Sequence, residues 1–204
     1  MRLASIRTGV LLIAAAAVLP GCTKQQLQGQ GASYLIIENL TALPGKVAGS
    51  ASEDTDEKNV LESDVVANVS GTATVVADGG RAVLRLGLKD PGTSTNPSQP
   101  TSTNFITVTR YNVRYLRSDG RNAQGVDVPY AFDGAATGTV TDETAEILFT
   151  LVRVQAKQES PLKALWAGGA LSTLAEVTFY GHDQAGRAVS IKGVIGVNFA
   201  NYGD

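Results

Sequence analysis

Apolar residues recur at every second position along much of this chain, and this period constrains the fold more than any other feature. From 187 to 199, alternate residues are apolar or glycine, while Ser190, Lys192 and Asn198 lie on the other face. Alternation of this kind is typical of a strand with one face on a core, whereas an amphipathic helix repeats every 3.6 residues. Comparable patterns predict further strands at 34–40, 60–69, 82–88, 105–117, 135–140, 145–154 and 173–179.

The strand expected at 105–117 changes its apolar parity partway. Ile106 and Val108 occupy even positions, whereas Tyr111, Val113 and Tyr115 occupy odd ones. Because a shift of one residue exchanges the two faces of a strand, we expect a bulge near residues 109–110. The alternative is a strand that crosses from one sheet to the other.

Polar segments separate the expected strands. Asp and Gly predict turns at 78–81, 119–121 and 183–187. The proline-containing segment 89–104 has no strand pattern and predicts a long mobile loop, and 160–169 can hold one helical turn that begins at Pro161. Many short strands with almost no helix indicate an all-β fold, an antiparallel β-sandwich of immunoglobulin-like architecture.

Residues 1–21 have the features of an export signal. Arg2 and Arg7 precede an uncharged apolar run at 10–19, which is too short to span a bilayer and suits the core of a signal peptide. The run ends in Leu19-Pro20-Gly21-Cys22, which resembles the lipobox of bacterial lipoproteins, with Pro20 as a departure from the usual pattern. The resemblance implies removal of residues 1–21 and lipid modification of Cys22. The alternative is a signal peptide without lipidation.

Charge and cysteine content restrict what the remaining chain can do. Residues 1–21 hold two of the 17 basic residues and none of the 19 acidic ones, which leaves a formal balance of −4. This acidity argues against nucleic acid as a partner, because such proteins carry basic stripes. Cys22 is the only cysteine, so no disulfide is available. We expect a flexible tether at 22–33 and one domain at 34–204.

The usual catalytic and metal-binding patterns are missing from the sequence. His182 is the only histidine, too few for a zinc or copper site, and we expect it in an exposed turn. No phosphate-binding or dinucleotide motif is present, so no cofactor is expected. Ser160 and Lys163 share the Ser-x-x-Lys spacing of penicillin-binding enzymes, but an all-β chain lacks the helical domain that presents that serine. We therefore predict a protein that is not an enzyme. The acidic segment 53–57 leaves a weak calcium site open.

Two groups of residues are candidates for ligand binding. Aromatic side chains beside carboxylates are used by sugar-binding modules, although such rings also close the ends of sandwiches. Arginines on the outer face of the strand at 105–117 either cover a solvated face or bind an anionic partner. The candidates are Tyr130, Phe132 and Trp166 in the first group, and Arg110 and Arg114 in the second, with Arg117 and Arg121 near the tip of that strand.

Three segments resemble uncharacterised bacterial envelope lipoproteins. They are 110–115 (RYNVRY), 118–130 (SDGRN with GVDVPY) and 177–183 (VTFYGHD). The resemblance implies a lipid-anchored β-sandwich in the cell envelope and brings no known activity. The expected function is a non-catalytic binding or scaffolding module, held to the membrane by its lipid, with an envelope protein or polysaccharide as partner. The alternative is a carbohydrate- or peptidoglycan-binding protein. Thr23 after the cysteine is typical of outer-membrane sorting in a Gram-negative host.

Overall fold

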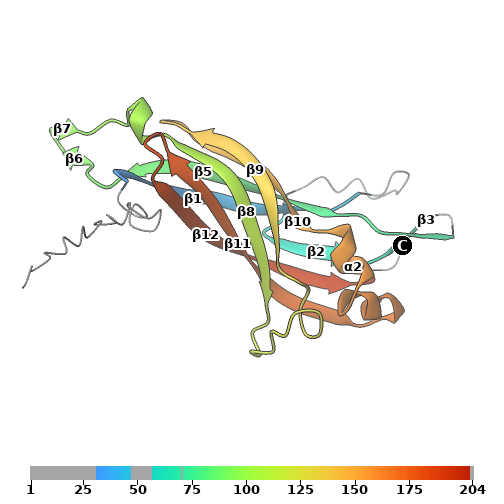
Figure 1. The fold of residues 1–204 in the computed structure, drawn as a ribbon. Coiled ribbons are helices and arrows are strands. Elements are labelled where there is room, and N and C mark those ends of the chain that lie inside the picture. Colours follow the sequence, from blue (N-terminus) through green and yellow to red (C-terminus); the bar gives the residue numbers. More distant parts are fainter. Residues whose placement is uncertain (1–30, 47–56, 70, 203–204) are drawn as a thin grey trace, which may run out of the picture.

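The computed structural model describes residues 31–46, 57–69 and 71–202. The export signal, Cys22, the tether up to residue 30 and residues 53–56 lie outside these ranges. Within them the chain is mostly β-strand, as predicted, and its strands form two main sheets (Figure 1). No helix in the described part of the chain is long and apolar enough to cross a membrane.

A three-stranded and a five-stranded sheet make up the body of the domain. The first has the order β1 (Ser33–Leu43), β5 (Asp78–Leu88), β10 (Ala145–Val152). The second has the order β2 (Val60–Asp64), β12 (Ala188–Ala200), β11 (Ala170–Asp183), β8 (Ile106–Leu116), β9 (Phe132–Val140). Two small ribbons pair β3 (Ala67–Val69) with β4 (Thr72–Thr74) and β6 (Gly92–Thr93) with β7 (Asn96–Pro97).

One strand pair departs from the wholly antiparallel arrangement that we expected. Strand β2 pairs with β12 in parallel, from Val60 opposite Gly196 to Asp64 opposite Ala200. A tight hairpin cannot join parallel neighbours. Turn signals, which mark hairpins, therefore give no indication of this pairing between strands that are far apart in the sequence.

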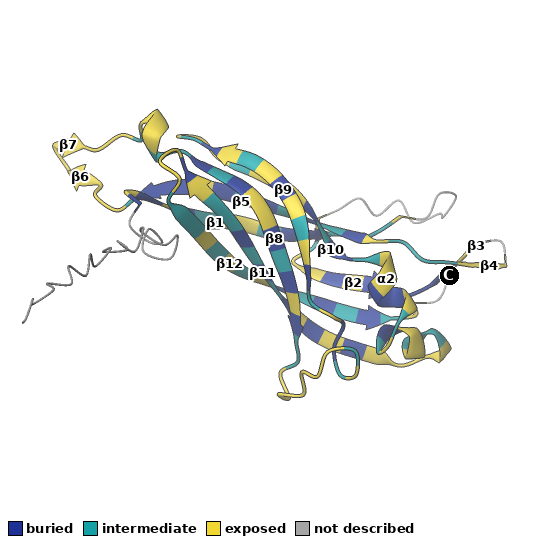
Figure 2. Cartoon of the chain, viewed as in Figure 1, coloured by how far each residue is buried: buried dark blue, intermediate teal, exposed yellow. Residues whose placement is uncertain are grey.

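The period of two places its apolar face on the core as predicted. In β12, Ile195, Val197 and Phe199 are buried, whereas Val194 on the other face is exposed (Figure 2). Val189 and Ile191 share the inward face but are only partly buried. The sheets thus enclose one apolar core to which every long strand contributes.

The predicted bulge in β8 is confirmed. Against β9, Val108 pairs with Gly138 but Arg110 pairs with Ala135, so the register shifts at Thr109. The pairing with β11 shifts at the same place. Strand β8 stays in the five-stranded sheet along its whole length, and the chain changes sheets between β9 and β10 instead.

The turn predicted at 78–81 is wrong, because these residues begin strand β5. Gly80 lies opposite Phe149 of β10, and a Cβ at residue 80 would overlap the phenylalanine ring. The glycine therefore makes room for an aromatic side chain. The other two turns are confirmed, with Gly120 and Gly186 at positive φ.

The two long polar segments both contain short regular elements. The segment 89–104 contains the β6–β7 ribbon and the 3₁₀ turn η1 (Ser102–Asn104), so the expectation of a segment without strands is wrong there. The segment 160–169 forms the 3₁₀ helix η2 (Leu162–Ala167), which matches the predicted helical turn. A short helix α2 (Val154–Gln158), not predicted from the sequence, follows β10.

Candidate functional site

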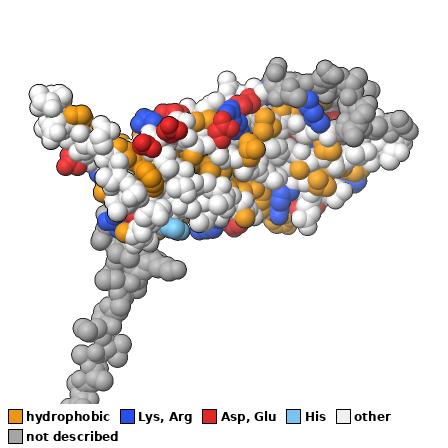
Figure 3. Space-filling view, turned by 90° about the horizontal axis from the view of Figure 1, so that it is seen from above, with side chains coloured by type: hydrophobic (Ala, Val, Ile, Leu, Met, Phe, Trp, Pro, Cys, Tyr) orange, Lys and Arg blue, Asp and Glu red, His pale blue; other side chains and the backbone are white. Residues whose placement is uncertain are grey.

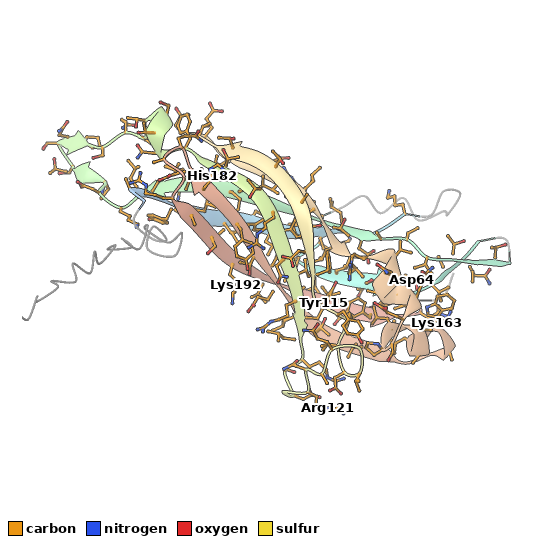
Figure 4. All side chains as sticks on the ribbon, in the orientation of Figure 1. Asp64, Tyr115, Arg121, Lys163, His182 and Lys192 are labelled. Carbon is orange, nitrogen blue, oxygen red and sulfur yellow. The ribbon has the colours of Figure 1, made fainter. Side chains whose placement is uncertain are left out.

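The outer face of the five-stranded sheet carries two of the candidate binding residues, Arg110 and Arg114. On β8, Arg110 and Arg114 are exposed on this face, while Tyr111, Val113 and Tyr115 point into the core. The bulge at Thr109 produces this arrangement, because it shifts the parity before the apolar residues of the second half. Figure 4 shows Lys192 of β12 projecting outward and Tyr115 lying within the sandwich.

Arg110 is held between the two strands that flank β8. Its Nη1 lies 3.1 Å from Asp133 Oδ1 on β9. On the other side, its guanidinium lies over the ring of Tyr180 on β11, 3.8 Å from the ring centroid. Arginine stacks well on aromatic faces and binds carboxylates, so both neighbours fix the same side chain.

Glu176 of β11 connects two further cations across the sheet. One carboxylate oxygen lies 3.5 Å from Arg114 Nη2 on β8, and the other lies 3.0 Å from Lys192 Nζ on β12. Glu176 is mostly buried, whereas both cations are about half exposed. Each exposed pair contributes at most about 1 kcal/mol to stability. The pairs matter here because the single carboxylate of Glu176 offsets part of the positive charge of Arg114 and Lys192.

The arginines at the tip of β8 are also paired. Arg117 and Arg121 both contact Asp119, at 2.6 Å and 3.0 Å. Side-chain hydrogen bonds from Arg117 and a backbone bond from Arg121 hold the pKa of Asp119 well below its usual range. The four arginines along β8 and its tip therefore do not form an unpaired cationic stripe, because each has an acidic partner. Acidic and basic side chains also lie beside one another in the view of Figure 3.

The same outer face carries an apolar row that we did not predict. Gly196 of β12 pairs with Val60 on one side and Leu174 on the other. Val60, Leu174 and the neighbouring Val194 are exposed by 49%, 46% and 55%. Gly196 has no side chain to separate them, and a Cβ there would press on Val60. The apolar row, defined as Val60, Leu174 and Val194, lies beside the charged pairs of Glu176.

The three candidate aromatic residues do not form one solvent-facing row. Phe132 is buried, 6.2 Å from the ring of Tyr111 and beneath the guanidinium of Arg153. It faces inward because it pairs with Val113, a core residue of β8. Phe132 therefore belongs to the core, in line with the alternative that such rings pack inside the sandwich.

Tyr130 and Trp166 are more accessible than Phe132. Tyr130 is 46% exposed and lies against Gly125. Trp166 is partly buried, donates its indole N–H to the carbonyl of Lys157 at 3.0 Å, and carries the ammonium of Lys163 over its ring. The contacts of Trp166 thus join η2 to α2.

The side chains that could bind a metal are dispersed over the described ranges. No group of three or more His, Cys, Asp and Glu side chains is arranged to hold a metal ion within those ranges. His182 lies in strand β11 rather than in the turn where we expected it, and its Nδ1 is 3.1 Å from the carbonyl oxygen of Asp183. It is exposed (Figure 4).

A buried polar centre lies at the end of the sandwich that carries α2. Asp78 of β5, Ser63 of β2 and Lys157 of α2 meet there, and all three are buried. Nearby, Tyr115 donates its hydroxyl to the carbonyl of Leu151 at 2.6 Å, and burial strongly raises its pKa. No sequence motif links these residues, because they come from four strands and one helix.

An open depression lies near η1 at the other end. Hydroxyl and amide side chains dominate its lining, which consists of Ser102, Thr103, Phe105, Thr107, Thr139 and Gln184. The hydroxyls of Thr107 and Thr139 lie 3.0 Å apart across β8 and β9. This lining contains no carboxylate or amine, so it offers hydrogen bonds rather than charge.

The fold and these surfaces define an all-β domain of two sheets with one outer face that is part charged and part apolar. The chain matches no protein-family model, no curated protein and no solved structure.

Proposed function

We propose that this chain is a lipid-anchored protein of the cell envelope, whose domain is a non-catalytic binding or scaffolding module. The lipobox-like ending at Cys22 supports the anchor. Two packed sheets support an immunoglobulin-like architecture in the general sense of a two-sheet sandwich. In a Gram-negative host, Thr23 supports sorting to the outer membrane.

The exposed apolar row is the observation that carries the binding function. Val60, Leu174 and Val194 are contributed by three adjacent strands and remain about half exposed on the outer face of the sheet. Protein interfaces combine an apolar centre with a polar rim, and arginine and tyrosine are enriched in them. Arg110, stacked on Tyr180 of the same face, fits that composition. The proposed partner is therefore an envelope protein.

The position of the N-terminus supports an accessible outer face. Ala32 accepts a backbone hydrogen bond from Lys89, and Ser33 donates its hydroxyl to the carbonyl of Asn104, so the chain enters the domain beside η1. Residues 22 to 31 span at most about 36 Å when extended. On this proposal the end with η1 and the β11–β12 hairpin faces the membrane. The long strands lead away from that end (Figure 1), which leaves the outer face of the sheet accessible.

Capture of partners from the native envelope tests the proposal. The wild-type lipoprotein is compared with Leu174→Glu combined with Val194→Glu, which places two charges in the apolar row. The matched control is Leu148→Glu, because Leu148 is 65% exposed on the three-stranded sheet. We expect the double variant to lose a partner that wild type and control both retain. Equal recovery by all three proteins would contradict a partner surface at this face.

Binding of a polysaccharide is the second candidate, and the depression near η1 favours it. Its hydroxyl and amide groups match the hydroxyls of sugars, and Phe105 adds a partly buried ring. Thr107→Val combined with Thr139→Val removes the paired hydroxyls at similar volume. Loss of binding to purified envelope polysaccharide in this variant, with protein partners retained, would favour the second candidate over the first.

A further inference from the structure

The pair Asp78 and Lys157 is almost completely removed from solvent. Their side chains are 3% and 0% exposed, and Lys157 Nζ lies 2.8 Å from Asp78 Oδ2. Asp78 Oδ1 accepts the backbone N–H of Gly45 at 2.8 Å, and Oδ2 accepts the hydroxyl of Ser63 at 2.6 Å. The carboxyl group is thus held in a fixed orientation against the amine.

The amine of Lys157 has few polar partners in its buried surroundings. An ammonium has three N–H donors. Among the described residues, Nζ has one close acceptor, Asp78 Oδ2, and even this contact lacks the angles of a hydrogen bond. A buried amine with so few partners leaves much of its hydrogen-bonding capacity unused, which is costly away from water.

We propose that Asp78 and Lys157 are joined by an amide bond between their side chains. A proton first passes from Lys157 Nζ to Asp78 Oδ2 across the ion pair; the lone pair of the resulting amine then attacks Asp78 Cγ, and a C–N bond forms. The carboxyl oxygen Oδ2 leaves with its own proton and one from Nζ as a single water molecule. Nζ thus gives up two protons and both leave with Oδ2 in the water molecule, so no oxidant, reductant or further reactant is required.

The surroundings supply what this condensation needs. The two reacting groups are fixed in contact, which replaces a bimolecular encounter by an intramolecular one. The N–H of Gly45 faces Oδ1, where negative charge develops in the tetrahedral intermediate. The hydroxyl of Ser63 donates to Oδ2, the oxygen that leaves. Val152, which pairs with Asp78, is fully buried and helps to keep out the water that would reverse the reaction.

The bond would give the domain a covalent link that cysteine cannot provide. The sequence has one cysteine, which our proposed function assigns to the lipid anchor. An amide between β5 and α2 would close a long loop of the chain and hold the helix, with its contacts to η2, on the end of the sandwich. Long covalently closed loops reduce the freedom of the unfolded chain.

Tryptic digestion of the full-length protein followed by mass spectrometry tests the bond. Trypsin does not cut after an acylated lysine, so residues 154–163 should remain intact and be attached to residues 59–81. We expect a branched peptide whose mass is the sum of the two peptides less one water molecule. Recovery of 59–81 as a free linear peptide, together with cleavage after Lys157, would overturn the proposal.

Lys157→Arg is the matched variant, because it keeps a cation at α2 while a guanidinium is a much weaker nucleophile. Both proteins carry the same lipid, so their intact masses can be compared directly. We expect the wild type to be lighter than the variant by the sequence difference plus one water molecule. A difference that equals the sequence change alone would also overturn the bond. If the variant does not accumulate, the wild-type digestion decides the question by itself.

Discussion

The ring of Tyr111 on β8 lies against Gly134, its direct partner on β9, and fills the space that a side chain at residue 134 would occupy. The same tyrosine reaches the other sheet. Its hydroxyl accepts the backbone N–H of Thr150 on β10 at 3.1 Å, and its ring lies 5.4 Å from that of Phe149. Tyr111 therefore joins the two sheets, and Gly134 makes its position possible.

Gly134→Ala should destabilise the domain by about 1–3 kcal/mol, because the added methyl group forces the Tyr111 ring to move within a packed core. Urea unfolding measures this loss. Gly79→Ala is the matched control, since Gly79 also lies in a strand but a Cβ there meets only ordinary contacts with Leu43. The control should stay within about 0.5 kcal/mol of wild type. Similar losses in both variants would show that crowding by Tyr111 is not the cause.

Val197→Ala and Val194→Ala make the same chemical change on opposite faces of β12. Val197 is fully buried, so its truncation should cost about 2–3 kcal/mol in unfolding free energy. Val194 is 55% exposed in the apolar row, and its truncation should cost no more than about 0.5 kcal/mol. Chemical denaturation of the two variants distinguishes them. A larger loss for Val194→Ala would mean that the faces of β12 are assigned incorrectly.

Asp183 should make stability depend on pH in the acid range. Burial raises its pKa, but hydrogen bonds from the backbone and side chain of Arg187 and from the N–H of Ala185 outweigh burial, so the pKa is lowered. The folded state therefore favours the carboxylate. This stabilisation is present above the unfolded pKa of about 4 and is lost as the pH falls through the lower folded value.

Asp183→Asn should accordingly reduce the loss of stability between about pH 5 and about pH 2. Urea unfolding of wild type and variant at several pH values in this range gives the two slopes. The variant is also expected to be less stable than wild type at neutral pH, because it loses the ion pair with Arg187. An unchanged slope would show that Asp183 does not contribute to the acid sensitivity.

The apolar pattern within single strands was sufficient to predict which face of a strand is buried and where a strand bulges. The faces of β12 and the bulge at Thr109 follow from apolar parity alone. Gly80 was misread as a turn residue because its role is set by Phe149, which is distant in the sequence and pairs with it only in the folded sheet. The inward orientation of Phe132 likewise depends on its register with β8.

The outer face of the five-stranded sheet and the buried polar centre depend on the order of the strands in the sheets. The alternation of apolar residues within a strand does not encode that order. Arg110 and Arg114 were placed correctly on an outer face, but their partners Asp133 and Glu176 come from the two strands that flank β8. The apolar row exists because β2 lies next to β12 in parallel. Asp78 and Lys157 have no local signal that links them, since one begins a strand and the other lies in a short helix.

Intact-mass analysis of the membrane-extracted wild-type protein is the most direct test of the central claim, which is lipid anchoring through Cys22. We expect a chain that begins at residue 22 and carries acyl chains, because Cys22 offers the only thiol. Cys22→Ser should leave the protein without this modification and release it from the membrane fraction. A wild-type mass equal to that of an unmodified processed chain would contradict the account.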